Sequence, residues 1–279
     1  MHLILEFIDA VLTHGFMSRG LIASIIVGIM AGAIGTFVIL RGLSPMGDAI
    51  SHAVIPGVAI SHVLNISHLI GATVFGVLAS LAIGFISENS KLKKDAIIGI
   101  VFSSFFALGI ILISRVRSTG DLHNVLFGNI LTVNEQNIIA IAVIALLLFI
   151  FIGVFYKELL LTSFDETLAQ VYGIKTRLIH YSFLLMLTLV VVTSLQVVGA
   201  VLVVAMVITP AATSYLLTNR LPIMLLLSSL IGAISATIGL FFSFTFNFPT
   251  GSTIVVVLGI IFITIFLFAP KKGIIVNKN

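Results

Sequence analysis

The sequence predicts an all-α, polytopic membrane protein with eight or nine transmembrane helices. Hydrophobic residues make up 59% of the 279 residues and charged residues only 9%, whereas soluble domains carry roughly 25% charged residues. The mean hydropathy is +1.29, and apolar runs of about 18 residues or more, each long enough to cross a bilayer as a helix, recur along the chain. We therefore expect one membrane-embedded domain over residues 18–270.

Residues 1–17 are predicted to form an amphipathic helix at the membrane surface. Apolar residues recur every three or four positions there, namely Leu3, Ile4, Phe7, Ile8, Val11 and Leu12. Glu6 and Asp9 lie off this stripe. Such a pattern is typical of helices that lie in the interface plane with one face in the lipid.

The apolar runs and the polar breaks between them then predict the spans in order. Nine are expected, at about 20–40, 46–64, 67–86, 96–114, 137–156, 178–195, 198–217, 223–245 and 252–269. The breaks at 64–68 and 195–198 are short. Eight spans therefore remain an alternative.

The distribution of basic residues predicts the orientation. With the N-terminus outside, the inside loops hold Arg41, Lys91, Lys93, Lys94, Lys157, Lys175, Arg177, Arg220, Lys271, Lys272 and Lys278, and the outside loops hold Arg19, Arg115 and Arg117. Because basic residues collect in cytoplasmic loops, this asymmetry indicates an extracellular N-terminus and a cytoplasmic tail at 271–279, in the cell membrane. The net charge of +4 is scattered among loops and does not indicate a nucleic acid partner.

The longest inside connection, residues 156–177, is predicted to contain a short helix within the segment 160–176. Ser163 or Asp165 could cap this helix, Leu168 and Val171 would form its apolar face, and Gly173 would end it. We expect it either to dock a soluble partner or to be a solvated loop. The other inside connections are too short to dock a partner.

Asp48 and His52 are the principal candidate site. In the predicted topology, Asp48 is the only acid well away from the loops and span ends, and an aspartate at a helix centre costs about 2.5–3.5 kcal/mol. Ser44 could cap the helix with Pro45 at its first position, which puts Asp48 and His52 four apart on one face. A carboxylate and an imidazole so placed can bind one Mn²⁺, Zn²⁺ or Fe²⁺ ion. Alternatively, the two form a structural pair at a helix N-terminus.

The sequence lacks the motifs of a membrane enzyme. It has no G-x-x-x-x-G-K-[ST] phosphate loop, no H-E-x-x-H zinc motif and no G-x-S-x-G nucleophile. It has no cysteine, which excludes disulfides and thiolate ligands. We therefore expect a protein that is not itself an enzyme and holds no permanently bound cofactor.

Three ordered motifs resemble those of the ABC-3 family, the permeases of manganese, zinc and iron ABC transporters. LRGLSPMGDAISHAVIPGVAIS at 40–61 resembles the family's second-span signature, TSFDETLAQVYGI at 162–174 its cytoplasmic coupling segment, and VVGAVLVVAMVITPAATSYLL at 197–217 a late-span pattern. The similarity extends from about Arg19 to Pro270 and is greatest to manganese permeases of Gram-positive type.

The resemblance implies a fold, partners and a function. The fold is that of the vitamin B12 and siderophore importers, assembled as a homodimer with cytoplasmic ATP-binding cassette subunits and an extracellular metal-binding lipoprotein receptor. The function is ATP-driven import of a divalent ion, manganese first and zinc or iron otherwise. The alternative is a secondary metal transporter or channel without an ATPase partner.

The resemblance also assigns roles to individual residues. Asp48 and His52 match the family's metal-coordinating pair, and Arg19 falls where related importers place a basic residue against the receptor. Asn124 stands where histidine is expected in the manganese branch. The residues that match the segment engaging the ATPase are Asp165, Glu166, Leu168, Ala169 and Gly173.

Overall fold

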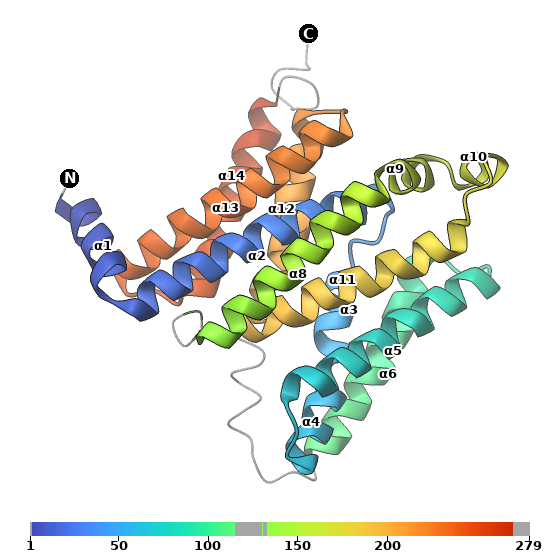
Figure 1. The fold of residues 1–279 in the computed structure, drawn as a ribbon, viewed down its shortest axis with the longest axis horizontal. Helices are drawn as coiled ribbons and strands as arrows, with labels where there is room; N and C mark the ends of the chain where they lie inside the picture. Colours follow the sequence, from blue (N-terminus) through green and yellow to red (C-terminus); the bar gives the residue numbers. More distant parts are fainter. Residues whose placement is uncertain (1, 115–129, 131–132, 270–279) are drawn as a thin grey trace.

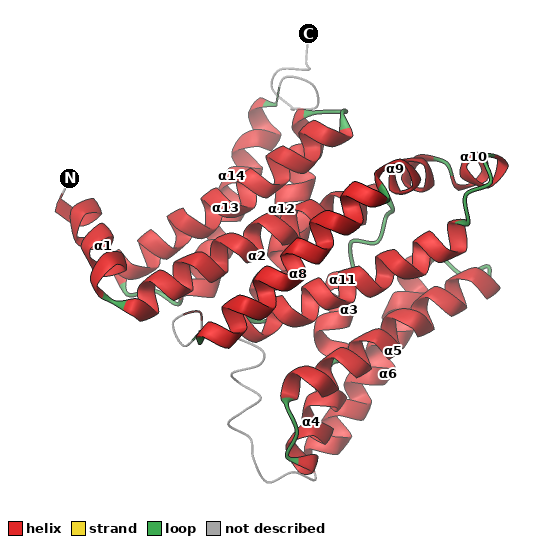
Figure 2. Ribbon diagram, in the orientation of Figure 1, coloured by secondary structure: helices red, strands yellow, loops and turns green. Residues whose placement is uncertain are grey.

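A computed structural model of the chain describes residues 2–114, 130 and 133–269. Over these residues the secondary structure is entirely helical (Figure 2). The helices, labelled in Figure 1, are α1 (His2–Thr13), α2 (Gly15–Leu40), α3 (Met46–Ala53), α4 (Ile55–Leu64), α5 (His68–Asn89), α6 (Lys94–Ser114), α8 (Glu135–Val154), α9 (Tyr156–Phe164), α10 (Glu166–Val171), α11 (Thr176–Val198), α12 (Ala200–Leu217), α13 (Leu221–Phe246) and α14 (Thr250–Phe268).

Eight of the described helices are long and apolar enough to cross a membrane. The segment 46–64, predicted as a further span, is divided into α3 and α4 with a break at Val54. Pro56 accounts for the break because it has no N–H to donate to the His52 carbonyl one turn earlier, and its ring crowds that carbonyl. The described residues thus give the eight spans of the alternative prediction, and the segment predicted as a further span is interrupted beside the candidate metal residues.

The central helix α2 packs closely on α13 through small residues. A Cβ placed on Gly28 would lie 2.7 Å from the carbonyl of Gly232, so the two backbones are in direct contact. About two turns further along α2, Thr36 shares a buried hydrogen bond of 2.9 Å with Ser228 of α13. Close packing of this kind is how helices associate in lipid, where the hydrophobic effect provides no drive for association.

The chain reverses between α11 and α12 at the single residue Gly199. Its backbone has φ +82° and ψ 162°, a region that is open essentially to glycine alone. This one-residue turn explains why the polar break between two predicted spans is so short. Pro210 lies inside α12, which remains one helix through that position.

The N-terminal helix α1 lies across the end of α2 and α13 (Figure 1). Phe7 is buried against Phe241 and Phe244, with ring centroids 5.4 and 5.8 Å away. Other apolar residues of the predicted stripe stay exposed, as expected for a helix that faces lipid: Leu3, Ile4, Ile8 and Leu12. The helix ends at Thr13, and α2 begins at Gly15, five residues before the start of the first predicted span at about 20.

Candidate functional site

The connection from α2 to α3 runs into the bundle, so that α3 starts deep among α5, α6, α11 and α12 (Figure 1). Leu43 and Met46 anchor this connection and are 3% and 0% exposed. The prediction that Ser44 caps α3 is wrong: the N-cap residue is Pro45, and no side chain caps the helix. Burial of the connection takes over the role that a cap would have in fixing where the helix begins.

Asp48 and His52 lie on one face of α3, as predicted. Asp48 Oδ1 is 3.4 Å from His52 Nε2, and the two side chains are 52% and 25% exposed. Two ligand atoms that each bind one ion at about 2.0–2.1 Å are separated by roughly 2.8–3.4 Å for bond angles between 90° and 109°. The pair is therefore already spaced to share one divalent cation.

The His52 ring is held by two aromatic residues of α6. Its centroid lies 5.5 Å from that of Phe102 and 5.4 Å from that of Phe106, both in edge-to-face geometry. Its Nδ1 is buried without a hydrogen-bond partner. The neighbouring Ser51 is buried and donates to the Gly47 carbonyl at 2.8 Å, so its hydroxyl proton is already used within the helix. Packing therefore aims Nε2 of His52 at Asp48.

Within one copy of the chain, Asp48 and His52 alone are too few ligands for a complete metal site. Among the described residues, no group of three or more histidine and acidic side chains is placed to hold an ion. Manganese, zinc and iron sites need more than two ligands. The exposed side of Asp48 is where further ligands can approach. If lipid covered that side, the charged Asp48 side chain would cost about 2.5–3.5 kcal/mol.

The end of the bundle where α2 begins carries the predicted receptor residue. Arg19, near the start of α2, lies 3.8 Å from Glu135 at the start of α8 and thus joins two helix ends. At the same end, the rings of His62 and His68 stack at 6.0 Å. Asn124, which stands where a histidine is expected, lies outside the residues that the structure describes.

The predicted coupling segment forms two short helices at the opposite end. Asp165 caps α10 and accepts a hydrogen bond from the Leu168 amide at 2.9 Å, which confirms one of the two predicted caps. Ser163, the other candidate, lies within α9. Gly173 turns the chain with φ +77° two residues after α10 ends.

Most of the predicted coupling residues lie at the surface. Glu166 and Leu168 are exposed, whereas Ala169 is fully buried and therefore faces the bundle. Around them, four large apolar side chains outside the candidate spans are 45–81% exposed and form what we term the α9–α10 apolar patch: Phe164, Leu168, Val171 and Tyr172.

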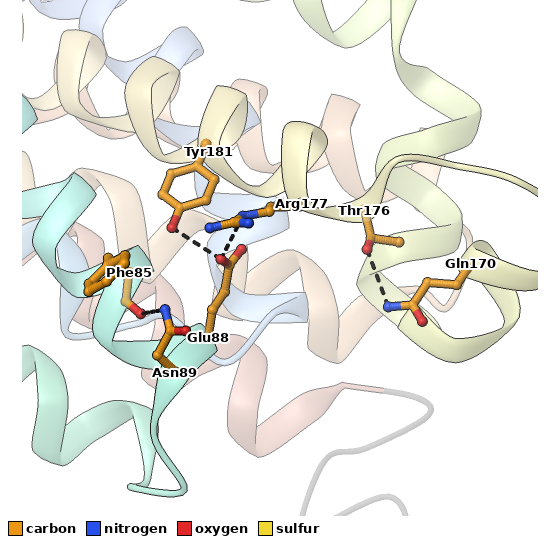
Figure 3. A network of polar contacts seen from close by, with 7 residues as sticks. All are labelled: Phe85, Glu88, Asn89, Gln170, Thr176, Arg177 and Tyr181. Carbon is orange, nitrogen blue, oxygen red and sulfur yellow. Dashed lines mark hydrogen bonds and ion pairs between the residues drawn. The ribbon is translucent and has the colours of Figure 1, made fainter.

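Sequence reasoning missed two polar groups at this end. Figure 3 shows Glu88 of α5 facing Arg177 and Tyr181 of α11, at 2.9 and 3.2 Å. In addition, Arg41 reaches from the end of α2 to α9. Burial lowers the pKa of Arg41 to about 10, with Glu166 opposing the shift, so the side chain keeps its charge at neutral pH. The sequence contains one indication of the Arg41 contact, namely a single arginine a few residues before Asp48.

Comparison with protein families and named relatives agrees with these features. Residues 13–269 match the model of the ABC 3 transport family. The manganese transport system membrane protein MntC of Listeria innocua is 53% identical, over 98% of both chains. The manganese import system permease protein ScaB of Streptococcus gordonii is 50% identical, over 99% of both chains.

Solved structures give the same result for the fold. PsaBC from Streptococcus pneumoniae, in complex with Fab, contains a chain of 48% identity that superposes with a TM-score of 0.89, over 99% of this chain and all of that one. A metal-chelate type ABC transporter in an inward-facing conformation is 18% identical with a TM-score of 0.74, over 92% of this chain and 87% of the other. The second likeness concerns the fold alone and confirms the predicted permease fold.

Proposed function

We propose that this chain, which belongs to the ABC 3 transport family, is the membrane-spanning permease subunit of an ATP-driven manganese importer. The observation that carries the proposal is the Asp48–His52 pair, spaced 3.4 Å apart within a broken transmembrane helix. Relatives at 50–53% identity are named for manganese transport and import, which supports manganese over zinc or iron.

The ligand chemistry suits a transported ion rather than a resident one. One carboxylate oxygen and one imidazole nitrogen are ligands that Mn²⁺ accepts, and no thiolate is present to favour softer metals. An ion that must leave again needs a site of moderate affinity. The lack of further ligands from the same chain is consistent with that requirement.

The proposal includes a second copy of the chain. The open side of Asp48 would face its counterpart across a two-fold axis, and two pairs of ligands would then surround one ion. This arrangement would also keep the carboxylate away from lipid, where it is costly. The pathway would thus run between the two copies.

ATP hydrolysis is assigned to a separate partner. The sequence has no phosphate-binding loop, and the α9–α10 apolar patch offers exposed apolar area at the end where the basic connections lie. We propose that the ATP-binding subunit docks on this patch in the cytoplasm. The receptor that delivers the ion would meet the opposite, extracellular end near Arg19.

The experiment is uptake of Mn²⁺, Zn²⁺ and Fe²⁺ into liposomes that contain the complete transporter, with wild-type chain, Asp48→Asn or Asp95→Asn. Both acids lie in the first turn of a helix, so the variants lose the same helix-dipole interaction. We expect Asp48→Asn to lower Mn²⁺ uptake by more than about tenfold, since even outer-shell partners of metal ligands contribute that much. Asp95→Asn should transport normally.

Two results would contradict the proposal. Wild-type uptake by Asp48→Asn would remove the ligand role. Uptake by this chain alone, driven by an ion gradient and independent of ATP, would favour the secondary transporter or channel instead.

A further inference from the structure

Arg41 joins the end of α2 to the coupling helix α9. It is the first residue after α2 and lies five residues before α3 begins at Met46. Its Nε donates to Ser163 Oγ at 3.1 Å, and its Nη2 donates to Thr162 Oγ1 at 2.8 Å. In the part of the chain that the structure describes, these are the side-chain hydrogen bonds that reach α9 from another element.

The two hydroxyl groups are oriented to accept from the guanidinium. Thr162 Oγ1 donates its own proton to the Glu158 carbonyl at 2.7 Å, and Ser163 Oγ donates to the Leu159 carbonyl at 2.6 Å. Their lone pairs are therefore left for Arg41. The fork of donors that only arginine provides matches two adjacent acceptors, whereas lysine offers a single point charge.

Phe183 of α11 fixes the other side of the guanidinium. The Arg41 Cζ atom lies 4.5 Å from the centre of the Phe183 ring, a cation–π contact. Phe183 is itself buried and packs edge-on against Phe37 of α2 at 6.4 Å. Arg41 therefore has a defined position between α2, α9 and α11.

The connection from Arg41 to the metal pair is short and packed. The Leu43 amide donates to the Val38 carbonyl, and the Met46 amide donates to the Leu43 carbonyl, both at 2.9 Å. Leu43 and Met46 are buried. Because this connection is tightly packed, a displacement of Arg41 moves the start of α3 as well. Asp48 lies in the first turn of that helix.

Space for such a displacement exists next to Arg41. A cavity of about 220 Å³ adjoins Arg41 and is also lined by Lys94, Glu166, Thr176 and His180. It separates parts of α9 and α10 from the starts of α6 and α11. The coupling helices can therefore shift against the bundle while Arg41 keeps hold of α9.

We infer that Arg41 is a positioning residue that transmits movement of α9 to α3, and so sets when Asp48 and His52 can hold or release the ion. This inference rests on the proposed function. Arg41 acts through Thr162 and Ser163 on one side and through the connection to α3 on the other. Its loss would separate ATP hydrolysis from transport without removing a metal ligand.

The test uses the complete transporter in liposomes with Arg41→Gln, or with Thr162→Val and Ser163→Ala together. Three quantities are measured: Mn²⁺ binding, ATP hydrolysis, and Mn²⁺ moved per ATP hydrolysed. We expect Mn²⁺ moved per ATP to fall by about tenfold or more in both, as for the loss of hydrogen bonds to a charged group. Mn²⁺ binding should stay within about twofold of wild type.

Combining the changes shows whether Arg41 acts through these hydroxyls. The triple variant combines Arg41→Gln with Thr162→Val and Ser163→Ala. It should move no less Mn²⁺ per ATP than Arg41→Gln alone, because both sets of changes break the same contact. If the two sets acted independently, their effects would multiply. Arg41→Lys should recover part of the loss. The control Arg177→Gln, which breaks an ion pair between α5 and α11 that does not involve α9, should keep the wild-type ratio.

Each other outcome counts against the inference. An unchanged Mn²⁺-to-ATP ratio in Arg41→Gln, multiplied effects in the triple variant, or an equal loss in Arg177→Gln would each overturn it. If Arg41→Gln fails to assemble, the hydroxyl pair alone decides. A failure of the proposed function looks different, because wild type itself would then move no Mn²⁺.

Discussion

Replacing Gly28 by alanine tests whether direct backbone contact holds the centre of the bundle together. The new Cβ would lie 2.7 Å from the carbonyl carbon and oxygen of Gly232, whereas ordinary contact begins at 3.4 Å. The atoms that it meets belong to the backbone and cannot rotate away. Therefore α2 and α13 must separate by about 0.7 Å, the difference between the two distances.

The cost of that separation follows from packing. A gap of about 0.5–1 Å forfeits a quarter to a half of the dispersion attraction between facing atoms, and overpacked cores lose about 1–3 kcal/mol. The interface also holds the Thr36–Ser228 hydrogen bond of 2.9 Å, which the separation would lengthen. At about 2–4 °C per kcal/mol, we expect the unfolding midpoint to fall by about 2–12 °C.

The assay is thermal unfolding in detergent, followed by far-UV circular dichroism because the chain contains no tryptophan or cysteine. Gly259→Ala is the matched control: it makes the same substitution within α14, where an added Cβ meets nothing within 4 Å. The control should unfold at the wild-type temperature or slightly above, since alanine favours helix over glycine. Equal midpoints for the two variants would refute the backbone contact.

Two further predictions concern the reversal and the coupling segment. Gly199→Ala should destabilise the protein by about 1–3 kcal/mol, because alanine is strained at φ +82° and ψ 162°. Thermal unfolding measures this effect, with Gly259→Ala as the control. An unchanged unfolding midpoint would show that the turn tolerates a side chain. Leu168→Glu should weaken binding of the ATP-binding subunit by about tenfold or more, since a charge would replace an exposed apolar contact. Pull-down of the purified subunit measures it, and undiminished binding would place the docking surface elsewhere.

The sequence predicted those features that depend on local pattern. Apolar runs fixed the spans to within a few residues, and the α10 cap at Asp165 follows from the preference of short polar side chains for helix starts. Spacing along one helix placed Asp48 and His52 on a shared face. Each of these predictions depends only on residues that are close together in the sequence.

What the sequence did not reveal depends on contacts between distant segments. The start of α3 is fixed by the burial of Leu43 and Met46 rather than by Ser44, and that burial requires the whole bundle. Arg41 meets Thr162 and Ser163 across more than a hundred positions in the chain. No local pattern reports such a contact, although an arginine next to an intramembrane acid was a reason to look for its partner.

The exposure of Asp48 links the metal site to the assembly. A carboxylate that is 52% exposed in one copy cannot face lipid without a cost of about 2.5–3.5 kcal/mol. Water alone would lower that cost but would leave the ion only two protein ligands. In the proposed dimer, a second copy would lower the cost and complete the ligand set at once, so the same exposed carboxylate supports both the proposed dimer and the proposed site.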